Sequence, residues 1–284
     1  MRHPRFHLFN SAIKVCFHVA SPYTLDVEDA QRDLVDPAVK GTLNVLKSCH
    51  KNKIRRVVLT SSVAAITDAP KAGYTFTEKD FNELSTLARN PYFFSKICAE
   101  LAAWDFVKDK PEMKLVSINP SGVIGPSLNK DLNATPKFLL EFLSGKFPFL
   151  FEAYIPMVHI DDVVEAHIKG GSLPESKFQG TGPHRFLCTQ VPAPSYERIL
   201  QILKEKYPKG TFPSSYQVPS WIPYALSYFY GAGTGSFLRT NISKGEMLLS
   251  NDVIKKEFRM EFQSVEKAIC DTVDDFIKWG HLPA

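Results

Sequence analysis

The chain has 284 residues, of which 44% are hydrophobic and 23% charged, proportions typical of a globular enzyme with one domain or one domain and a smaller lobe. The formal charge of +4 is small and the Lys and Arg residues are scattered, which argues against a nucleic-acid-binding protein. The five Cys residues lie far apart without a Cys-x-x-Cys pair, so neither a zinc site nor a disulfide framework is expected.

The sequence shows no targeting or membrane-spanning pattern. Asn10 and Lys14 interrupt the apolar stretch that a signal peptide would need. Charged residues and prolines interrupt the most apolar later segment, 138–157, which excludes a transmembrane helix there. We therefore expect a soluble cytoplasmic protein, a monomer or homodimer, with no membrane partner.

Buried strands and helices alternate in the first half of the chain. Short apolar runs predict strands at 15–20, 56–61 and 115–118. Helical spacing of apolar residues predicts helices at 36–52, where Pro37 suits the first turn, and at 91–108. This order implies parallel strands joined by crossover helices, which is an α/β fold.

The second half is less regular. Apolar periodicity predicts short strands at 155–160 and 186–189 and helices at 134–145, 161–170, 195–207, 222–230 and 264–279. We interpret 1–125 and 155–190 as a sheet core and 126–154 and 191–284 as a substrate lobe within one compact unit.

A candidate proton-transfer pair opens the helix predicted at 91–108. Tyr92 and Lys96, in Tyr92-Phe93-Phe94-Ser95-Lys96, are four residues apart and so share one helix face. A free Tyr has a pKa of about 10, and a nearby ammonium is expected to lower it. The phenol could then donate a proton to a carbonyl oxygen as hydride reaches the carbon.

By itself this spacing is weak evidence, because about one Tyr-x-x-x-Lys match is expected by chance in a chain with ten Tyr residues. The context strengthens it. The strand predicted at 56–61 runs into Ser61 and Ser62, and a Ser hydroxyl at a strand end could orient the same carbonyl oxygen. The Ser and the Tyr–Lys pair therefore meet at the carboxyl edge of the sheet, where α/β proteins bind ligands.

The sequence resembles the extended short-chain dehydrogenase/reductase superfamily, in particular its dihydroflavonol reductase, cinnamoyl-CoA reductase and aldehyde reductase group. The segments that carry the resemblance are 17–22, 36–46, 57–62, 92–100 and 158–163. It implies a Rossmann-like doubly wound parallel sheet with a smaller α+β substrate lobe. It also implies a nicotinamide cofactor, NADP in this group with NAD as the alternative, and reduction of a ketone or aldehyde of a small organic molecule, aromatic ones included.

The resemblance assigns roles to named positions. Ser62, Tyr92 and Lys96 match the family's catalytic residues, with Ser61 as the alternative to Ser62, and Tyr92 and Lys96 also contact the cofactor. The remaining cofactor-binding positions are Ala20 and Ser21 on the adenosine and phosphate side, and Pro120, Ser121 and Val123 in the loop beside the nicotinamide. Substrate specificity is expected in 129–154 and 213–239.

Three other features receive structural interpretations. Asp161 and Asp162 are expected to cap a helix, and His159 is expected to pack in a strand without binding a metal. The glycine-rich segment 231–235 follows a helical pattern rather than a strand, so we interpret it as a loop of the lobe and not as a phosphate-binding turn.

One departure from the family concerns the N-terminus. The family opens with a strand and a glycine-rich turn that hold the cofactor pyrophosphate, and residues 1–14 contain no such pattern. We therefore expect a sheet without its first strands, as in a fragment, splice variant or incomplete gene model, with the strand at 15–20 as an aggregation-prone edge. Two other functions stay open: a nucleotide-sugar epimerase or dehydratase, and a truncated protein without catalytic activity.

Overall fold

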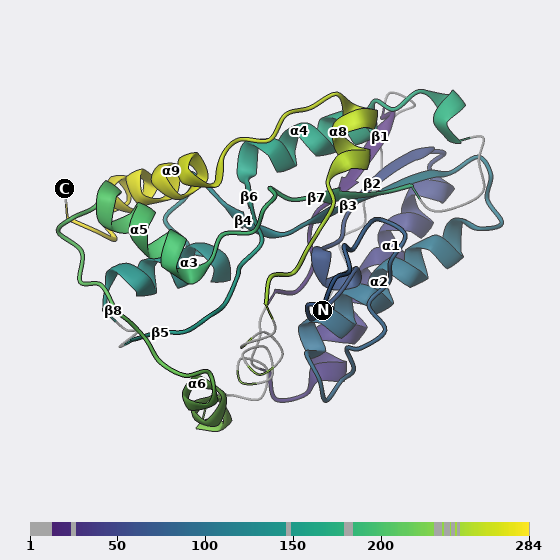
Figure 1. The fold of residues 1–284 in the computed structure, drawn as a ribbon. Helices are drawn as coiled ribbons and strands as arrows, with labels where there is room; N and C mark the ends of the chain where they lie inside the picture. The colour runs from purple at the N-terminus through teal and green to yellow at the C-terminus, as the bar shows by residue number, and fades with distance from the viewer. Residues whose placement is uncertain are drawn as a thin grey trace.

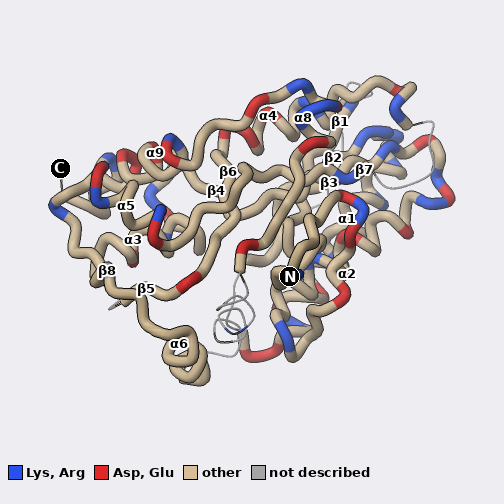
Figure 2. The backbone as a smooth tube through the Cα atoms, viewed as in Figure 1, with Lys and Arg blue, Asp and Glu red and all other residues tan. Residues whose placement is uncertain are grey.

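The computed structural model describes residues 13–23, 27–145, 149–178, 184–229, 235, 239, 242 and 245–283. Residues 231–234, which form most of the glycine-rich segment interpreted above as a loop, lie outside these ranges, as do residues 1–12. Basic and acidic residues are interspersed along the described chain (Figure 2).

The core of the fold is a four-stranded parallel sheet (Figure 1). Its strands are β1 (Val15–His18), β2 (Arg56–Thr60), β3 (Lys114–Pro120) and β7 (His184–Cys188), in the order β1-β2-β3-β7. Each strand pairs in parallel with its neighbour, so the four carboxyl ends lie along the same edge of the sheet. Among the described strands, β1 pairs only with β2 and therefore forms one side of the sheet.

Helices cover both faces of this sheet. Val57 and Leu59 of β2 pack in one hydrophobic cluster with α1 (Asp36–Lys51) and α2 (Pro91–Val107). Val58, between them, faces the opposite side and packs with α4 (Ile160–Gly171) and α8 (Asp252–Phe258). Alternate side chains of a strand point to opposite faces, so an all-apolar strand such as β2 is the pattern of a sheet buried on both sides. The prediction of an α/β fold with a parallel sheet is confirmed.

A second group of elements lies beside the sheet, at the opposite end of the molecule from α1 and α2 (Figure 1). Its helices are α3 (Ala134–Leu143), α5 (Tyr196–Lys206), α6 (Trp221–Leu226) and α9 (Val265–Lys278), and its strand pairs are β4 (Gly122–Ile124) with β6 (Met157–His159) and β5 (Phe149–Leu150) with β8 (Ser214–Gln217). Phe142 and Phe276 are almost fully buried in a hydrophobic cluster of their own between α3, α5 and α9. Elements distant in sequence thus build a separate hydrophobic core.

Side chains of α9 hold the chain just after β4 within this second group. The backbone N–H of Gly125, just after β4, donates to Thr272 Oγ1 at 2.8 Å, and that of Ser127 donates to Asp275 Oδ2 at 2.9 Å. These bonds fix the backbone just beyond Val123, one of the predicted cofactor-binding positions.

The structure differs from the predicted elements in a few places. The segment from Pro120 to Val123 was expected to be a loop, but Pro120 closes β3 and Val123 lies in β4. The seven-residue helix α8 has no counterpart among the predicted helices, because a segment this short shows little periodicity. Short helices of other types are η1 (Gln31–Val35), η2 (Val63–Ala65), η3 (Glu175–Phe178) and η4 (Ser227–Phe229).

Candidate active site

The two adjacent serines after β2 face different surroundings. Ser61 is buried, and its Oγ donates to Glu100 Oε2 at 2.5 Å. Ser62 has an extended backbone and opens η2, where its Oγ accepts the Ala64 N–H at 3.1 Å. The Ser62 hydroxyl also forms a hydrogen bond with Tyr92 that favours the phenolate. Of the two candidates, it is therefore Ser62 that lies against the Tyr–Lys pair.

Tyr92 and Lys96 lie at the start of α2. Pro91 occupies the first turn of the helix, where its missing N–H costs no helical hydrogen bond. Asn90, just before the helix, has a left-handed backbone (φ 52°), a conformation that Asn tolerates better than most residues. Its Nδ2 donates to the fully buried Asp68 carboxylate at 3.2 Å, and Arg89 pairs with the same carboxylate at 3.0 Å. Asp68 therefore fixes the point at which the Tyr92 helix begins.

Burial has opposite effects on the two titratable groups of the pair. It raises the pKa of Tyr92, with a further increase from Tyr23 and a partly opposing hydrogen bond from Ser62. It lowers the pKa of Lys96 to about 8. The expected lowering of the Tyr92 pKa is wrong in this structure, because loss of solvation is the largest effect on this group and raises its pKa. Tyr92 is thus a neutral phenol, a proton donor, at neutral pH.

Lys96 is buried with its Nζ 5.6 Å from the centre of the Tyr92 ring. Within the described part of the chain, no carboxylate or carbonyl oxygen forms a hydrogen bond or ion pair with this ammonium. A buried ammonium is costly without a polar partner, so a ligand that brings hydroxyl groups to it would be bound favourably. Lys96 also lowers the pKa of His18, after the larger effect of burial, which places β1 close to the same site.

The sequence analysis missed Tyr23, which packs against Tyr92. The two ring centres are 4.9 Å apart with an interplanar angle of 48°. Burial raises the pKa of Tyr23, and a hydrogen bond with Thr135 of α3 opposes that rise. Tyr23 thus connects the segment after β1 to the second group of elements. Its position, just beyond a predicted strand end, was the signal that could have identified it.

The other predicted residues lie along the same sheet edge. Ala20, exposed, and Ser21, half-buried, follow β1. Ser121 directly follows β3 and is 7% exposed, and its Oγ has no hydrogen-bond partner among the described residues. Its backbone N–H donates to Cys188 O at 3.1 Å, which secures the chain to β7. An unpaired buried hydroxyl at the carboxyl edge of a parallel sheet is a group that a bound molecule could satisfy.

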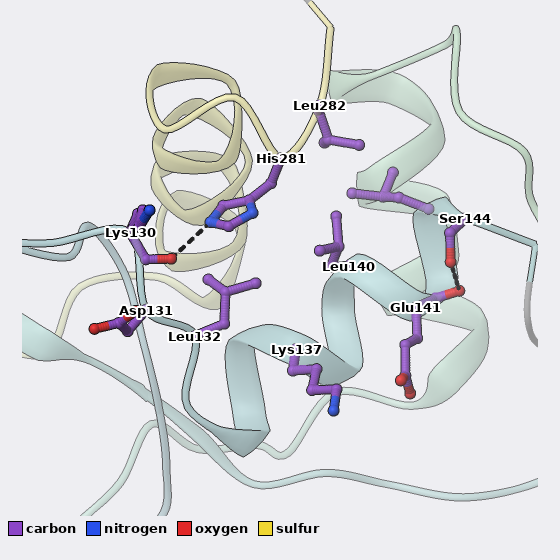
Figure 3. Close-up of a pocket in the computed structure, with 10 residues that line it drawn as sticks. Lys130, Asp131, Leu132, Lys137, Leu140, Glu141, Ser144, His281 and Leu282 are labelled. Carbon is purple, nitrogen blue, oxygen red and sulfur yellow. Dashed lines mark hydrogen bonds between the residues drawn. The ribbon is translucent and has the colours of Figure 1, made fainter.

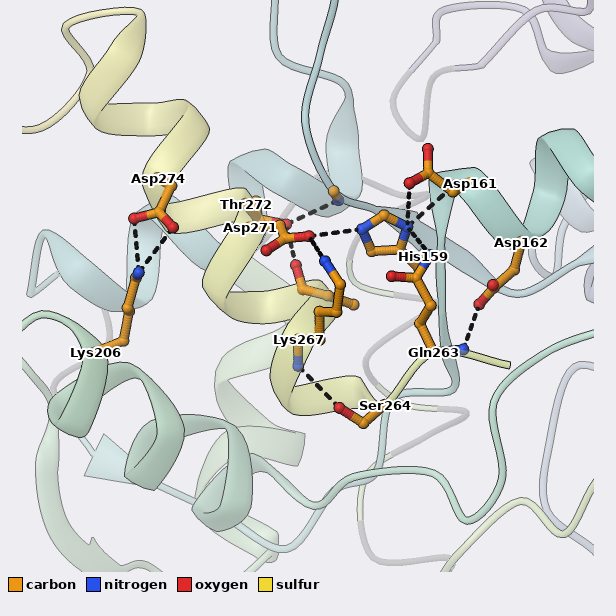
Figure 4. Close-up of polar contacts among 12 residues, drawn as sticks. His159, Asp161, Asp162, Lys206, Gln263, Ser264, Lys267, Asp271, Thr272 and Asp274 are labelled. Carbon is orange, nitrogen blue, oxygen red and sulfur yellow. Dashed lines mark hydrogen bonds and ion pairs between the residues drawn. The ribbon is translucent and has the colours of Figure 1, made fainter. Parts of the chain in front are cut away.

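His159 has the structural role predicted for it (Figure 4). Its Nδ1 accepts the Asp161 backbone N–H at 3.1 Å and faces the Gln263 amide at 3.1 Å, while its Nε2 lies 3.1 Å from Asp271 Oδ2. The ring is 1% exposed and caps α4. Asp162 accepts the backbone N–H of Gln263 at 3.0 Å, whereas the cap of α4 comes from His159 rather than from the Asp pair. No group of three potential metal ligands occurs among the described residues.

One hollow of the described structure lies away from this site (Figure 3). It measures about 800 Å³ and is lined by residues of α3, the segment before it and the C-terminal tail, including Lys137, Leu140 and His281. None of the predicted catalytic or cofactor-binding residues lines it. No described helix is long and apolar enough to cross a membrane.

Comparison with known proteins shows that the chain is similar to several reductases. It is 39% identical over 217 residues to cinnamoyl-CoA reductase CAD2 of Medicago truncatula, covering 72% of this chain and 63% of that protein. It is 29% identical to the NADPH-dependent methylglyoxal reductase GRE2 of Saccharomyces cerevisiae, covering 96% and 79%. This chain therefore covers less than two thirds of the length of the Medicago protein.

Solved structures agree with the sequence comparisons. Yeast methylglyoxal/isovaleraldehyde reductase Gre2, complexed with NADPH, superposes with a TM-score of 0.73 at 25% identity and covers 94% of this chain and 78% of that one. Gre2 of Candida albicans, also with NADPH, gives a TM-score of 0.71 at 27% identity and covers 94% and 77%. Residues 5–180 match the family model described as "NAD dependent epimerase/dehydratase family". The chain therefore belongs to the NAD dependent epimerase/dehydratase family.

Proposed function

We propose that the protein is an NADP-dependent oxidoreductase that reduces a ketone or aldehyde of a small organic molecule. The observation that carries the proposal is the contact of the Ser62 hydroxyl with Tyr92, next to the buried Lys96, at the carboxyl edge of the sheet. Family membership and the reductase names of the relatives support the reaction class.

The proposed site fits the nicotinamide–ribose half of the cofactor. The Lys96 ammonium could bind ribose hydroxyls, and the unpaired Ser121 hydroxyl faces the edge where the resemblance expects the nicotinamide. Pro120 and Val123 flank Ser121, and Ala20 and Ser21 lie after β1 for the adenosine and phosphate side. NADP is favoured over NAD because two structural relatives were solved with NADPH. When bound, the cofactor supplies the hydride.

Ser62, Tyr92 and Lys96 would each carry out one of the remaining steps: orienting the substrate, donating the proton and binding the cofactor. The Ser62 hydroxyl holds the substrate carbonyl oxygen by a hydrogen bond. The Tyr92 phenol, kept protonated by its burial, donates its proton to that oxygen as negative charge develops there. Lys96 binds and orients the ribose of the cofactor, and its charge stabilises the phenolate that Tyr92 becomes after the transfer. Only the last of these effects requires the ammonium form of Lys96.

We further propose that 1–125 with 155–190 forms the cofactor-binding core and that 126–154 with 191–284 forms the substrate lobe. Tyr23 and Thr135 lie where these parts meet, next to Tyr92. An aromatic wall at this point suits an apolar or aromatic substrate. Phe151, one of the aromatic residues in the expected specificity segments, is instead buried in the lobe core against Tyr196.

A nucleotide-sugar epimerase or dehydratase is the second candidate, because the family model covers those reactions too. The purified protein should be titrated with NADPH while the cofactor's fluorescence is followed, and then assayed with aldehydes, ketones and nucleotide sugars. Cofactor binding with turnover of a carbonyl panel supports the proposal. Turnover of nucleotide sugars alone would favour the second candidate, and absence of NADPH binding would favour a protein without catalytic activity.

A further inference from the structure

A buried carboxylate with four hydrogen bonds lies just behind the proposed site. Glu100 follows Lys96 by one turn of α2, as Lys96 follows Tyr92. Its side chain is fully buried and so is that of its ion-pair partner Arg185, which is 1% exposed. The Glu100 carboxylate accepts hydrogen bonds from Arg185 Nε at 2.6 Å, Trp104 Nε1 at 3.1 Å, Ser61 Oγ at 2.5 Å and Asn119 Nδ2 at 2.8 Å.

These bonds connect one helix to three neighbouring strands. Ser61 follows β2, Asn119 belongs to β3 and Arg185 belongs to β7, so a single carboxylate on α2 fixes the helix against all three. Both carboxylate oxygens have two partners, which limits rotation and sliding of α2 over the sheet. The positions of Tyr92 and Lys96 on that helix are thereby fixed as well.

The hydrogen bonds of Glu100 also reach Ser62, through Asn119, on the other side of the proposed site. Asn119 Nδ2 donates to Ser62 O at 3.1 Å in addition to Glu100. Its amide orientation is set by Ser117 Oγ, which donates to Asn119 Oδ1 at 3.0 Å. One amide group thus links the backbone that carries the Ser62 hydroxyl to the helix that carries Tyr92.

Arg185 extends the network to the chain between Ser62 and Tyr92. Its Nη1 donates to Glu78 O at 2.8 Å and to Asp80 O at 2.5 Å, and its Nη2 donates to Ala65 O at 3.3 Å. The guanidinium also lies 3.8 Å from the centre of the Phe81 ring. Five donors in a rigid plane suit such simultaneous contacts, and Lys could not reproduce them.

We propose that Glu100, with Asn119 and Arg185, positions Ser62 relative to Tyr92 and Lys96, so that the three groups can act on one carbonyl oxygen. This inference rests on the proposed reductase function. Glu100 touches none of the three catalytic side chains, so it is a positioning residue. A buried ion pair contributes little net stability compared with apolar side chains of similar volume, which leaves orientation as its more distinctive contribution.

The experiment compares Glu100→Gln and Ser61→Ala with the control Arg56→Lys. Arg56 is also a buried arginine, but it lies at the amino end of β2 and bonds Leu173 O and Glu175 Oε1, both at 2.7 Å, far along the strand from Ser62. For each protein, the thermal midpoint, kcat and KM would be measured. The pKa of Lys96 would be obtained from NMR of lysine-labelled protein, with its signal identified by Lys96→Arg.

We expect Glu100→Gln to lower kcat by about tenfold to a hundredfold, as small misplacements of catalytic groups do, with the KM for the carbonyl substrate little changed. Ser61→Ala, which removes one hydrogen bond and should fold, is expected to change kcat in the same direction by less. A shift of α2 in either variant would change the burial of Lys96 and hence move its pKa away from about 8. Arg56→Lys should lower the thermal midpoint while leaving kcat and the Lys96 pKa unchanged.

Two outcomes would contradict the inference. Variants that lose thermal stability as Arg56→Lys does, yet keep the wild-type kcat and Lys96 pKa, would show that Glu100 only stabilises the fold. If Glu100→Gln does not fold, wild-type values in Ser61→Ala lead to the same conclusion. A wild-type protein that reduces no carbonyl compound would refute the proposed function, and the Lys96 pKa would then still decide whether Glu100 positions the helix.

Discussion

The ammonium nitrogen of Lys96 lies 5.6 Å from the centre of the Tyr92 ring, one turn further along α2. Both groups are shifted towards their neutral forms, because each loses hydration in the protein. The pair is therefore arranged as a neutral proton donor beside an ammonium of lowered pKa, and not as a preformed phenolate. This arrangement leads to predictions for each residue.

Replacement of Tyr92 by Phe removes the proposed acid and keeps the ring that packs against Tyr23. We expect NADPH-dependent carbonyl reduction to fall by at least about a hundredfold, the usual contribution of a general acid. Steady-state assays would measure the loss, and Tyr216→Phe, at a residue 70% exposed, serves as the control. Undiminished turnover in Tyr92→Phe would refute the assignment.

Replacement of Lys96 by Met should stabilise the fold in a pH-dependent way. The folded protein holds Lys96 at a pKa of about 8, against 10.5 for an ordinary Lys, so folding opposes protonation of this amine. The penalty is fully present below pH 8 and disappears as the pH rises from about 8 to 10.5. At pH 7 the variant should therefore be more stable by roughly 3 kcal/mol.

Urea unfolding at pH 7 and at pH 10.5 would measure this difference. The exposed Lys47→Met variant should stay within about 0.5 kcal/mol of the wild type at both pH values. A Lys96→Met variant that is destabilised at pH 7 would mean that the ammonium has a compensating partner.

Cys16 should be the most reactive of the five thiols. Its interaction with the Cys49 thiol lowers the pKa of Cys16 to about 7, despite an opposing effect of burial. Burial instead raises the pKa values of Cys98 and Cys188. Because the thiolate is the nucleophile, iodoacetamide at pH 7 should modify Cys16 first, as peptide mass spectrometry would show.

The Cys49→Ala variant tests the cause of this reactivity. Without its neighbour, Cys16 should return towards an ordinary thiol pKa and react roughly tenfold more slowly at pH 7. Cys98→Ala should leave the rate at Cys16 unchanged. Equal rates in wild type and Cys49→Ala would show that the Cys16–Cys49 contact has no effect on reactivity.

Thr272→Val tests the connection between α9 and β4. The Thr272 hydroxyl accepts the Gly125 N–H at 2.8 Å and donates to Ala268 O at 2.7 Å. Valine has a similar shape but leaves the Gly125 N–H without a partner, which typically costs about 1–3 kcal/mol. Chemical denaturation would measure the loss, and an unchanged unfolding free energy would mean that water replaces the hydroxyl.

Local patterns were sufficient to predict the sheet core. The all-apolar run that includes Val57 and Val58 fits a strand covered on both faces, and its predicted end is within one residue of Thr60. Pro37 and Pro91 likewise marked helix starts within one residue. These signals are local, so no knowledge of tertiary contacts was required.

The rest depends on contacts between residues distant in sequence. The contact of Tyr23 with Tyr92 joins segments about seventy residues apart, and no periodicity reports it. The choice between Ser61 and Ser62 was likewise open, because it depends on which hydroxyl faces Glu100 across the sheet. The pKa of Tyr92 was predicted in the wrong direction since the extent of burial cannot be read from the spacing of Tyr and Lys.

The buried Asp68 carboxylate has a consequence for protein engineering. It accepts hydrogen bonds from Ser85 at 2.9 Å, Arg89 at 3.0 Å and Asn90 at 3.2 Å. A library that randomises Asp68 and its three partners to alter the substrate range would mostly yield misassembled active sites. Diversity introduced at Tyr23 and Thr135 would change the wall beside Tyr92 and leave the start of its helix intact.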